Sequence, residues 1–587
     1  MDVKTSDPAL ETDDAKPAWP AMSLAEATAI LTAPGMPCEM EEVVIRGVPT
    51  RVWKNAPPSL RAVVEGGRAF GERIFLVYED ERVSFEAFFR AVAHLAHRLA
   101  EEGVEKGDRV AVVMRNLPEW PVAFYAAAAI GAIVTPLNAW WTGPELEYGL
   151  VDSGSKVAIV DAERLERLAE HLSRCPELER VFVAREAEEV ASPLVVKLED
   201  VIGGPQDWAM LPERALPAVD IGPEDDATIF YTSGTTGKPK GALATQRNIN
   251  SNIIAGAFSA ARSFLRRGET PPAADPEAQR SSLLSVPFFH ATGCFAVLNP
   301  SLFGGAKLVM MHRWDAIRAF ELIEREKIAA AGGVPTIAWQ LIEHPERDKY
   351  DLSSLVSVSY GGAPCAPELV RRIKETFPKS EAGQGWGMTE TSATATSHGA
   401  EDYERRPDSC GPAVAVTDLK IVDPESEREL PTGAVGELWC KGPQVVKGYW
   451  MKPEATAQTF HEGWVKTGDL ARLDEEGFCY IIDRAKDMLI RGGENIYCIE
   501  VENALYDHPA VMDAAVVGIA HKTLGEEPAA VVTLKPGASA SEDELRAFVA
   551  ERLAAFKVPV KVRFWRETLP RNANGKILKP ELRKLFA

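Results

Sequence analysis

Apolar and polar residues follow two periods along most of the chain. Six apolar residues between 85 and 99 recur three or four positions apart, which predicts an amphipathic helix; they are Phe85, Phe88, Phe89, Val92, Leu95 and Leu99. A short apolar run at 110–114 then predicts a buried strand, and the alternation continues with a helix at 122–130, a strand at 132–135, a helix after Gly143 and a strand at 157–160. Such alternation is typical of an α/β fold with mainly parallel sheets.

The pattern resumes after residue 241 and then changes. Strands are expected at 283–286, 306–311, 328–331 and 356–360, with helices between them. The proline-bearing segment 266–280 predicts an exposed loop. Between 412 and 484 short strands alternate with glycines, which predicts a small antiparallel, barrel-like subdomain.

The two ends differ from this central part. Residues 1–20 are polar and are expected to be disordered, whereas 42–45 and 50–53 predict a hairpin. Near the C-terminus we expect strands at 514–519 and 529–534 and a helix from Ser541, whose capping box ends at Glu544 and whose apolar stripe runs to Phe556. We therefore predict a partly disordered N-terminal extension (1–57), a large domain of two α/β subdomains and one β-barrel-like subdomain (58–485), and a small α+β domain (486–587).

Composition limits the classes of partner and site that the chain could have. With 587 residues and a net charge of −21, the chain is long enough for several domains and too acidic for nucleic acid or an anionic membrane as its main partner. The eight cysteines contain no Cys-x-x-Cys pair, so we expect buried thiols rather than zinc or disulfides. The strongest apolar run, 122–137, is short and interrupted by Gly131 and Pro136, which predicts no integral membrane segment. The acidic first residues are not typical of a signal or transit peptide, and we expect a cytoplasmic protein.

Residues 231–241 read Tyr-Thr-Ser-Gly-Thr-Thr-Gly-Lys-Pro-Lys-Gly and follow a predicted strand. Glycines, hydroxyls and two lysines in one loop are what a polyphosphate requires. The loop is not a Walker A motif, because only two residues separate Gly234 from Gly237 and Pro239 follows Lys238. The residues expected to contact phosphate are Thr232, Ser233, Gly234, Thr235, Thr236, Gly237, Lys238 and Lys240.

Three further strings carry chemistry. Gly385-Trp386-Gly387-Met388-Thr389-Glu390 places an aromatic face beside a phosphate donor and a hard oxygen ligand for Mg²⁺. Asp469, expected in a tight turn, could accept hydrogen bonds from ribose hydroxyls or could be a local cap, and Arg484 follows fifteen residues later. Lys576 comes after a glycine turn; taken alone, it is typical of a solvated surface lysine.

Together these strings resemble the adenylate-forming superfamily, which includes acyl-CoA synthetases, adenylation domains of peptide synthetases and luciferases. The resemblance covers residues 60–587. It implies that a carboxylate attacks the α-phosphate of Mg·ATP to give acyl-AMP. The C-terminal domain then rotates about a hinge, and the thiol of coenzyme A displaces AMP.

The resemblance also assigns roles to residues. It implies that the phosphate loop clamps the β- and γ-phosphates, that Thr232 and Glu390 hold Mg²⁺, that Asp469 and Arg484 hold the ribose, that Lys486 is the hinge, and that Lys576 bridges carboxylate and α-phosphate. Nucleotide and CoA contacts are further implied for Gly362, Ala363, Pro364, Gly385, Trp386, Gly387, Met388, Thr389, Gly492, Gly493 and Glu494, and an acyl pocket for Phe289, His290, Trp339, Gly362 and Trp386. Trp386 replaces the usual tyrosine, and Cys498 stands where proline is common.

Three activities fit this resemblance. An acyl-CoA synthetase is favoured. A stand-alone adenylation enzyme that passes an amino acid to a carrier protein would carry an aspartate near 288–293, which is absent; a luciferase-like oxygenase is the third. The aromatic pocket residues favour a medium-chain, branched or arylalkanoic acid. Many relatives are dimers, so a homodimer is possible, but the sequence alone leaves the oligomeric state open.

Overall fold

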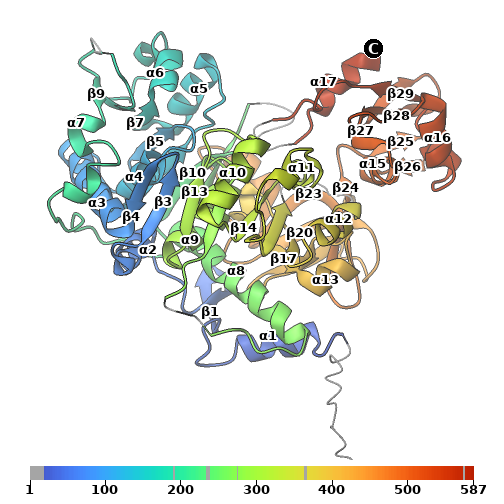
Figure 1. Cartoon of the computed structure of the whole chain (residues 1–587), viewed down its shortest axis with the longest axis horizontal. Helices are drawn as coiled ribbons and strands as arrows, with labels where there is room; N and C mark the ends of the chain where they lie inside the picture. The colour runs from blue at the N-terminus through green and yellow to red at the C-terminus, as the bar shows by residue number, and fades with distance from the viewer. Residues whose placement is uncertain are drawn as a thin grey trace, which may run out of the picture.

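The computed structural model describes residues 19–188, 192–232, 238–273, 275, 277–361, 367–492, 494–572 and 576–586, and every structural statement below concerns these residues. Two α/β lobes lie side by side, and the last hundred residues form a separate body at one end (Figure 1). In the described part, no helix is both long enough and apolar enough to cross a membrane.

The first lobe is built on an eight-stranded sheet whose central strands are parallel. Helix α3 (Phe85–Glu101) packs against helix α4 (Glu119–Ala129), and every residue of α4 is buried. These helices confirm the two predicted from the sequence. In spatial order the strands are β21 (Gly448–Tyr449), β11 (Gly241–Thr245), β10 (Asp226–Tyr231), β6 (Ile133–Pro136), β5 (Arg109–Val113), β7 (Ser155–Asp161), β8 (Arg180–Ala184) and β9 (Val195–Lys197).

A second eight-stranded sheet forms the other lobe, and it takes its last two strands from the start of the chain. The parallel core was predicted from the sequence, but this edge hairpin was not. The spatial order is β17 (Thr396–Gly399), β16 (Glu381–Trp386), β15 (Ser357–Gly361), β14 (Ala330–Gly333), β12 (Ser281–Leu284), β13 (Lys307–Met310), β3 (Ile74–Tyr78) and β4 (Glu81–Ser84). Helices of this lobe include α8 (Gln246–Arg266), α11 (Pro335–Glu343) and α12 (Glu368–Thr376).

The expected exposed loop at 266–280 begins too early. Arg266 is the last residue of α8 and is only 1% exposed, because its guanidinium pairs with Asp402. The loop therefore starts beyond Arg267, which closes the helix. The prolines that follow predict a loop, so the sequence does not reveal that the buried Arg266 still belongs to the helix.

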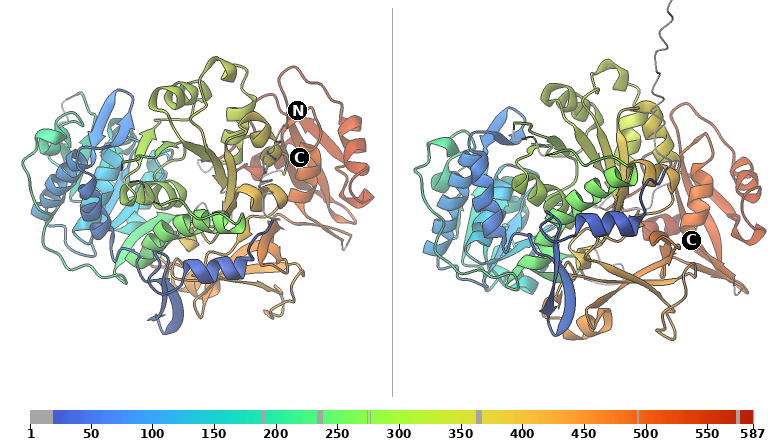
Figure 2. Two further views of the ribbon diagram at one scale, coloured as in Figure 1. Left: turned by 60° about the horizontal axis from the view of Figure 1, so that its bottom comes forward. Right: turned by 90° about the horizontal axis from the view of Figure 1, so that it is seen from below.

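The third sheet is antiparallel, as predicted, and the N-terminal extension packs beside it. The sheet order is β18 (Gly411–Pro412), β24 (Phe478–Arg484), β23 (Trp464–Leu473), β20 (Gly436–Lys441) and β19 (Asp418–Val422), with β22 (Phe460–His461) on β23. The predicted hairpin is confirmed as β1 (Met40–Ile45) and β2 (Val48–Trp53), and Arg51 of β2 pairs with Asp418. Helix α1 (Leu24–Leu31) lies along α8 (Figure 2).

The C-terminal body is a small α+β domain. Its sheet has the order β26 (Glu494–Ile496), β25 (Leu489–Arg491), β28 (Gly525–Leu534) and β27 (Val511–His521), with β29 (Lys561–Phe564) on β28. The capping box at Ser541 is confirmed at the start of α16 (Glu542–Ala550). This helix ends before Leu553 and Phe556, which pack on the domain core from the following segment, so the predicted stripe is too long. Helices α15 (Cys498–Tyr506) and α17 (Lys579–Arg583) complete the domain.

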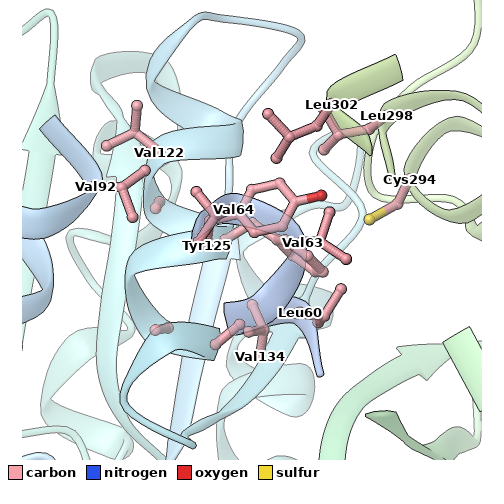
Figure 3. Close-up of a cluster of buried hydrophobic side chains, with 14 of the residues drawn as sticks. Leu60, Val63, Val64, Val92, Val122, Tyr125, Val134, Cys294, Leu298 and Leu302 are labelled. Carbon is pink, nitrogen blue, oxygen red and sulfur yellow. The ribbon is translucent and has the colours of Figure 1, made fainter. Parts of the chain in front are cut away.

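Buried side chains join the first lobe to the second. Tyr125 of α4 donates its hydroxyl to Oδ1 of Asn299 at 2.6 Å, across the contact between the lobes. Around it lie apolar residues of α2 (Leu60–Gly67) and of the helical segment Thr292–Leu298 (Figure 3). The segment that follows His290 is thus anchored on the first lobe.

Candidate active site

The phosphate loop connects two antiparallel neighbours, β10 and β11. Residues 233–237 lie outside the described part of the chain, but the base of the loop is closed by a hydrogen bond from the Thr232 amide to the Lys240 carbonyl at 2.9 Å. Nζ of Lys240 lies 4.5 Å from the ring centre of Tyr449, and Nζ of Lys238 lies 4.8 Å from that of Tyr148. Aromatic faces attract ammonium groups, so both lysines are held at the loop base.

Tyr449 contacts both Glu390 and Lys240 of the phosphate loop, so the carboxylate lies close to the loop. The side chain of Glu390 is buried, and its Oε1 accepts a hydrogen bond from the Tyr449 hydroxyl at 2.7 Å. Burial, followed by the Glu390 charge, raises the pKa of Tyr449, so this hydroxyl keeps its proton. Because Lys240 lies over the same ring, Tyr449 brings the carboxylate and the loop together.

A hard carboxylate oxygen beside a phosphate loop suits Mg²⁺, which uses one or two carboxylates together with substrate phosphates. The described residues contain no group of three or more His, Cys, Asp or Glu side chains that could bind a metal by themselves. Glu390 therefore fits a metal site that is completed by the nucleotide.

Trp386, Asp469 and Arg484 form a polar triad at the junction of the second and third sheets. The indole N–H of Trp386 donates to Oδ2 of Asp469 at 2.8 Å, and Nε of Arg484 lies 3.1 Å from Oδ1. Asp469 faces Arg484 across the β23–β24 ladder. The turn predicted at Asp469 is wrong, since this residue lies within a ten-residue strand; only Gly468, with φ of +70°, has a turn-like conformation.

Lys576 comes from the C-terminal domain and reaches this triad. Burial, followed by the nearby Arg484 charge, lowers its pKa to about 8, while Asp469 and Glu390 act in the opposite direction. Burial and then Arg484 also lower the pKa of Lys486, the predicted hinge. Three positive charges thus gather beside two carboxylates, which is an arrangement suited to an anionic ligand.

Phe289 and His290 follow β12 and lie side by side, with ring centres 4.7 Å apart. The preceding Phe288 is fully buried and stacks on Trp120 of α4 at 5.0 Å. Asn116 holds this segment from the first lobe: it accepts from the Phe288 amide at 3.0 Å and donates to the Val286 carbonyl at 3.1 Å.

Trp339 lies elsewhere. It projects from α11 into the hydrophobic cluster that contains Ile342 and Ile373, and Nζ of Lys535 in the C-terminal domain lies 6.0 Å from its ring centre. Its membership of the acyl pocket stays a prediction, because these contacts do not bring it to Phe289 or His290.

Most of the remaining predicted residues lie in the described part of the chain, and four lie outside it. A side chain on Gly385 would lie 2.8 Å from the Thr396 carbonyl, and one on Gly387 would lie 1.4 Å from that of Ala393, so both glycines allow close packing of the neighbouring chain. Gly492 has φ of +60° and bonds to the Leu524 carbonyl, just before Glu494 begins β26. Thr389 lies in the short turn that carries Glu390, and the Met388 amide donates to Thr391. Gly362, Ala363, Pro364 and Gly493 lie outside the described residues.

Sequence reasoning missed Tyr449, Tyr148 and Asn116. Tyr449 belongs to a two-residue strand that pairs with β11, a contact between segments two hundred residues apart. A weak signal existed only for Asn116, a polar residue three positions beyond the end of the apolar strand β5.

Comparison with known proteins identifies the family of this chain. The family described as AMP-binding enzyme matches residues 64–450, and the one described as AMP-binding enzyme C-terminal domain matches 500–576. The chain belongs to the AMP-binding enzyme family. Trp386 and Glu390 lie in the first match and Lys576 is the last residue of the second, whereas Asp469 and Arg484 lie between the two matches.

Similar proteins include feruloyl-CoA synthase of Amycolatopsis sp, 35% identical over 86% of this chain and 94% of the relative. A long-chain-fatty-acid–CoA ligase of Bacillus subtilis is 34% identical over 89% and 93%. Among solved structures, ATP-bound MatB from Rhodopseudomonas palustris superposes with a TM-score of 0.75 at 28% identity, covering 89% of this chain and 99% of that one. The expected fold and enzyme class, an AMP-forming acid–thiol ligase of the acyl-CoA synthetase type, are confirmed.

Proposed function

We propose that this enzyme activates a medium-chain, branched or arylalkanoic acid with Mg·ATP and transfers the acyl group from acyl-AMP to coenzyme A. The observation that supports this most strongly is the position of Lys576 beside Glu390, Asp469 and Arg484, because a C-terminal cation then faces the nucleotide-binding residues of the large domain.

In the first half-reaction the protein must bring two anions together. The Lys576 ammonium would lie between the carboxylate of the acid and the α-phosphate, lowering their repulsion and orienting the attack. Lys238 and Lys240 would bind the outer phosphates, and Asp469 would accept hydrogen bonds from the ribose hydroxyls. Mg²⁺, held by Glu390 with Thr232, would neutralise phosphate charge when bound.

The choice of acid rests on the segment at Phe288–His290. Phe288 stacks on Trp120, and Asn116 bonds the backbone at Phe288 and Val286, so the segment is held firmly; we infer that Phe289 and His290 on it form an aromatic wall of the acyl pocket. Such a wall suits a bulky apolar chain or an aryl group better than acetate. Relatives named for ferulate and for long-chain fatty acids bracket this range.

The predicted boundary between the large domain and the C-terminal domain, at residues 485 and 486, lies in the short connection between β24 and β25. We propose that Lys486 acts there as the hinge. Coenzyme A would then enter past Gly492 and Glu494. A cytoplasmic homodimer is our proposal for its location and assembly; light scattering on the purified protein would test the assembly.

A panel of acids tests the proposal. Pyrophosphate release would be measured with acetate, octanoate, palmitate, benzoate and 3-phenylpropionate, each with and without coenzyme A, and the thioester would be identified by mass spectrometry. We expect thioester formation with octanoate or the aryl acids and little with acetate. Preference for acetate would contradict the proposed class of acid. Formation of acyl-AMP without thioester would contradict coenzyme A as the acceptor of the acyl group.

A further inference from the structure

Lys535 of the C-terminal domain contacts helix α11 (Pro335–Glu343) of the large domain. Lys535 directly follows β28, and its Nζ lies 3.5 Å from Oε1 of Glu343 and 6.0 Å from the ring centre of Trp339. Trp339 and Glu343 are four residues apart on α11, so they lie on one face and form a small acceptor for a cation. The side chains of Lys535 and Glu343 are 31% and 21% exposed, which leaves this contact partly shielded from solvent.

The same strand supports the catalytic segment. Ala529 and Val531 of β28 belong to a hydrophobic cluster against which Ile577 packs, directly after Lys576. Two hydrogen bonds also hold this segment: the Lys576 amide donates to Oδ1 of Asn572 at 3.0 Å, and the Asn572 amide donates to the Lys576 carbonyl at 2.9 Å. Packed elements move together, so the position of Lys535 on α11 fixes where Lys576 can point.

We propose that Trp339 and Glu343 form a docking site for Lys535, and that this contact positions the C-terminal domain so that Lys576 faces Glu390 and Asp469 during adenylation. Lys535 is thus a positioning residue, which acts through the orientation of its domain and touches no reacting atom. The inference rests on the proposed function, since it assigns a role in the first of two half-reactions.

Separate measurement of the two half-reactions distinguishes this positioning role from a purely structural one. Adenylation would be followed as pyrophosphate release without coenzyme A, and thioester formation would be started from supplied acyl-AMP. An exposed ion pair and a cation–π contact together are worth about 1 kcal/mol, so we expect Lys535→Ala to slow adenylation about fivefold and to leave thioester formation unchanged. Lys535→Arg keeps the charge and can stack on the indole, and it should restore the rate.

Two more variants sharpen the test. Arg372 lies 3.3 Å from the same Oε1 of Glu343 but belongs to the large domain, so Arg372→Gln is a matched control that should change neither half-reaction by more than about twofold. Trp339→Leu should slow adenylation equally for every acid. A changed preference among acids in that variant would place Trp339 in the acyl pocket and would overturn its docking role.

Domain orientation gives a readout that needs no substrate. Asp80 and Asp543, whose side chains are 99% and 95% exposed, offer labelling positions in the two domains. Distance measurements between spin labels there should show one main population in the parent protein and a second one in Lys535→Ala. Equal slowing of both half-reactions, or an unchanged distance distribution, would overturn the inference. Failure of the proposed function would look different, because the parent protein itself would release no pyrophosphate with any acid.

Discussion

The indole N–H of Trp386 and the carboxylate of Asp469 are joined by a hydrogen bond of 2.8 Å, and Arg484 binds the other carboxylate oxygen at 3.1 Å. Asp469 is therefore oriented from two sides before any nucleotide is bound. A buried carboxylate held in this way keeps its lone pairs aimed in fixed directions, which lowers the entropy that a ribose must lose on binding.

Replacing Trp386 by Phe tests this orientation. The ring remains, but the hydrogen bond to a charged group is lost, and such bonds contribute about 1.5–3 kcal/mol. We expect KM for ATP to rise about tenfold with a smaller change in kcat, measured by pyrophosphate release over a range of ATP concentrations.

Trp314→Phe is the matched control for that experiment. The Trp314 indole N–H donates to Gln340 in the second lobe, apart from the triad. An equal rise of KM in both variants would mean that the Trp386 hydrogen bond has no special role in nucleotide binding.

The lowered pKa of Lys576 predicts a pH dependence. Its pKa of about 8 means that the ammonium form, which the proposed role requires, is present below pH 8 and is lost as the pH rises through that value. In the free enzyme, kcat/KM for adenylation should therefore fall above pH 8.

Thioester formation from supplied acyl-AMP provides the comparison, because its rate should rise over the same range as the thiol of coenzyme A ionises. Lys576→Arg keeps its charge, so the fall above pH 8 should disappear even if the rate is lower. A fall of the same size in that variant would assign the titration to another group.

The hydrogen bond between Tyr449 and Glu390 links the loop to the predicted metal ligand. In Tyr449→Phe the ring beneath Lys240 is kept, while Oε1 of Glu390 loses its donor at 2.7 Å. A freed carboxylate oxygen is less well oriented, so we expect the Mg²⁺ concentration for half-maximal adenylation to rise about three- to tenfold.

Tyr403→Phe serves as its control, since the Tyr403 hydroxyl pairs with that of Tyr360 at 2.8 Å within the second lobe. The expected result is an unchanged Mg²⁺ requirement. Identical Mg²⁺ curves for Tyr449→Phe and the parent protein would argue against Glu390 as a metal ligand.

The sequence predicts local features well, because each depends on neighbouring residues. The helix at Phe85, the capping box at Ser541 and the hairpin around Gly47 follow from spacing and turn chemistry alone. The predicted nucleotide residues came from short strings, and four of them, Glu390, Asp469, Arg484 and Lys576, are neighbours in the structure; their roles toward a nucleotide stay predictions.

Other features depend on contacts between distant segments. The edge strands β3 and β4 join a sheet whose other members come two hundred residues later, and the Tyr449 hydroxyl reaches Glu390 across 59 positions. The resemblance implies a pocket role for Trp339, and this stays a prediction; its position beside Lys535 depends on how two domains meet. No periodicity within one segment encodes these pairings.

Arg266 shows the same limit and gives a prediction for stability. Nη2 of Arg266 lies 2.9 Å from Oδ1 of Asp402, both side chains are at most 4% exposed, and Nη1 donates to the Met22 carbonyl at 2.9 Å. Removing one partner of a buried pair leaves an uncompensated charge, so Arg266→Met should lower the free energy of unfolding by about 3–5 kcal/mol. Arg371 pairs with Glu368 and Glu375 on the surface, and Arg371→Ala should cost less than about 1 kcal/mol. Urea unfolding followed by tryptophan fluorescence would measure both, and equal losses would show that the Arg266 pair contributes no more than a surface contact. Arg266 also bonds to the N-terminal extension. In Arg266→Met, residues 19–57 should therefore become accessible to proteolysis before the large domain unfolds.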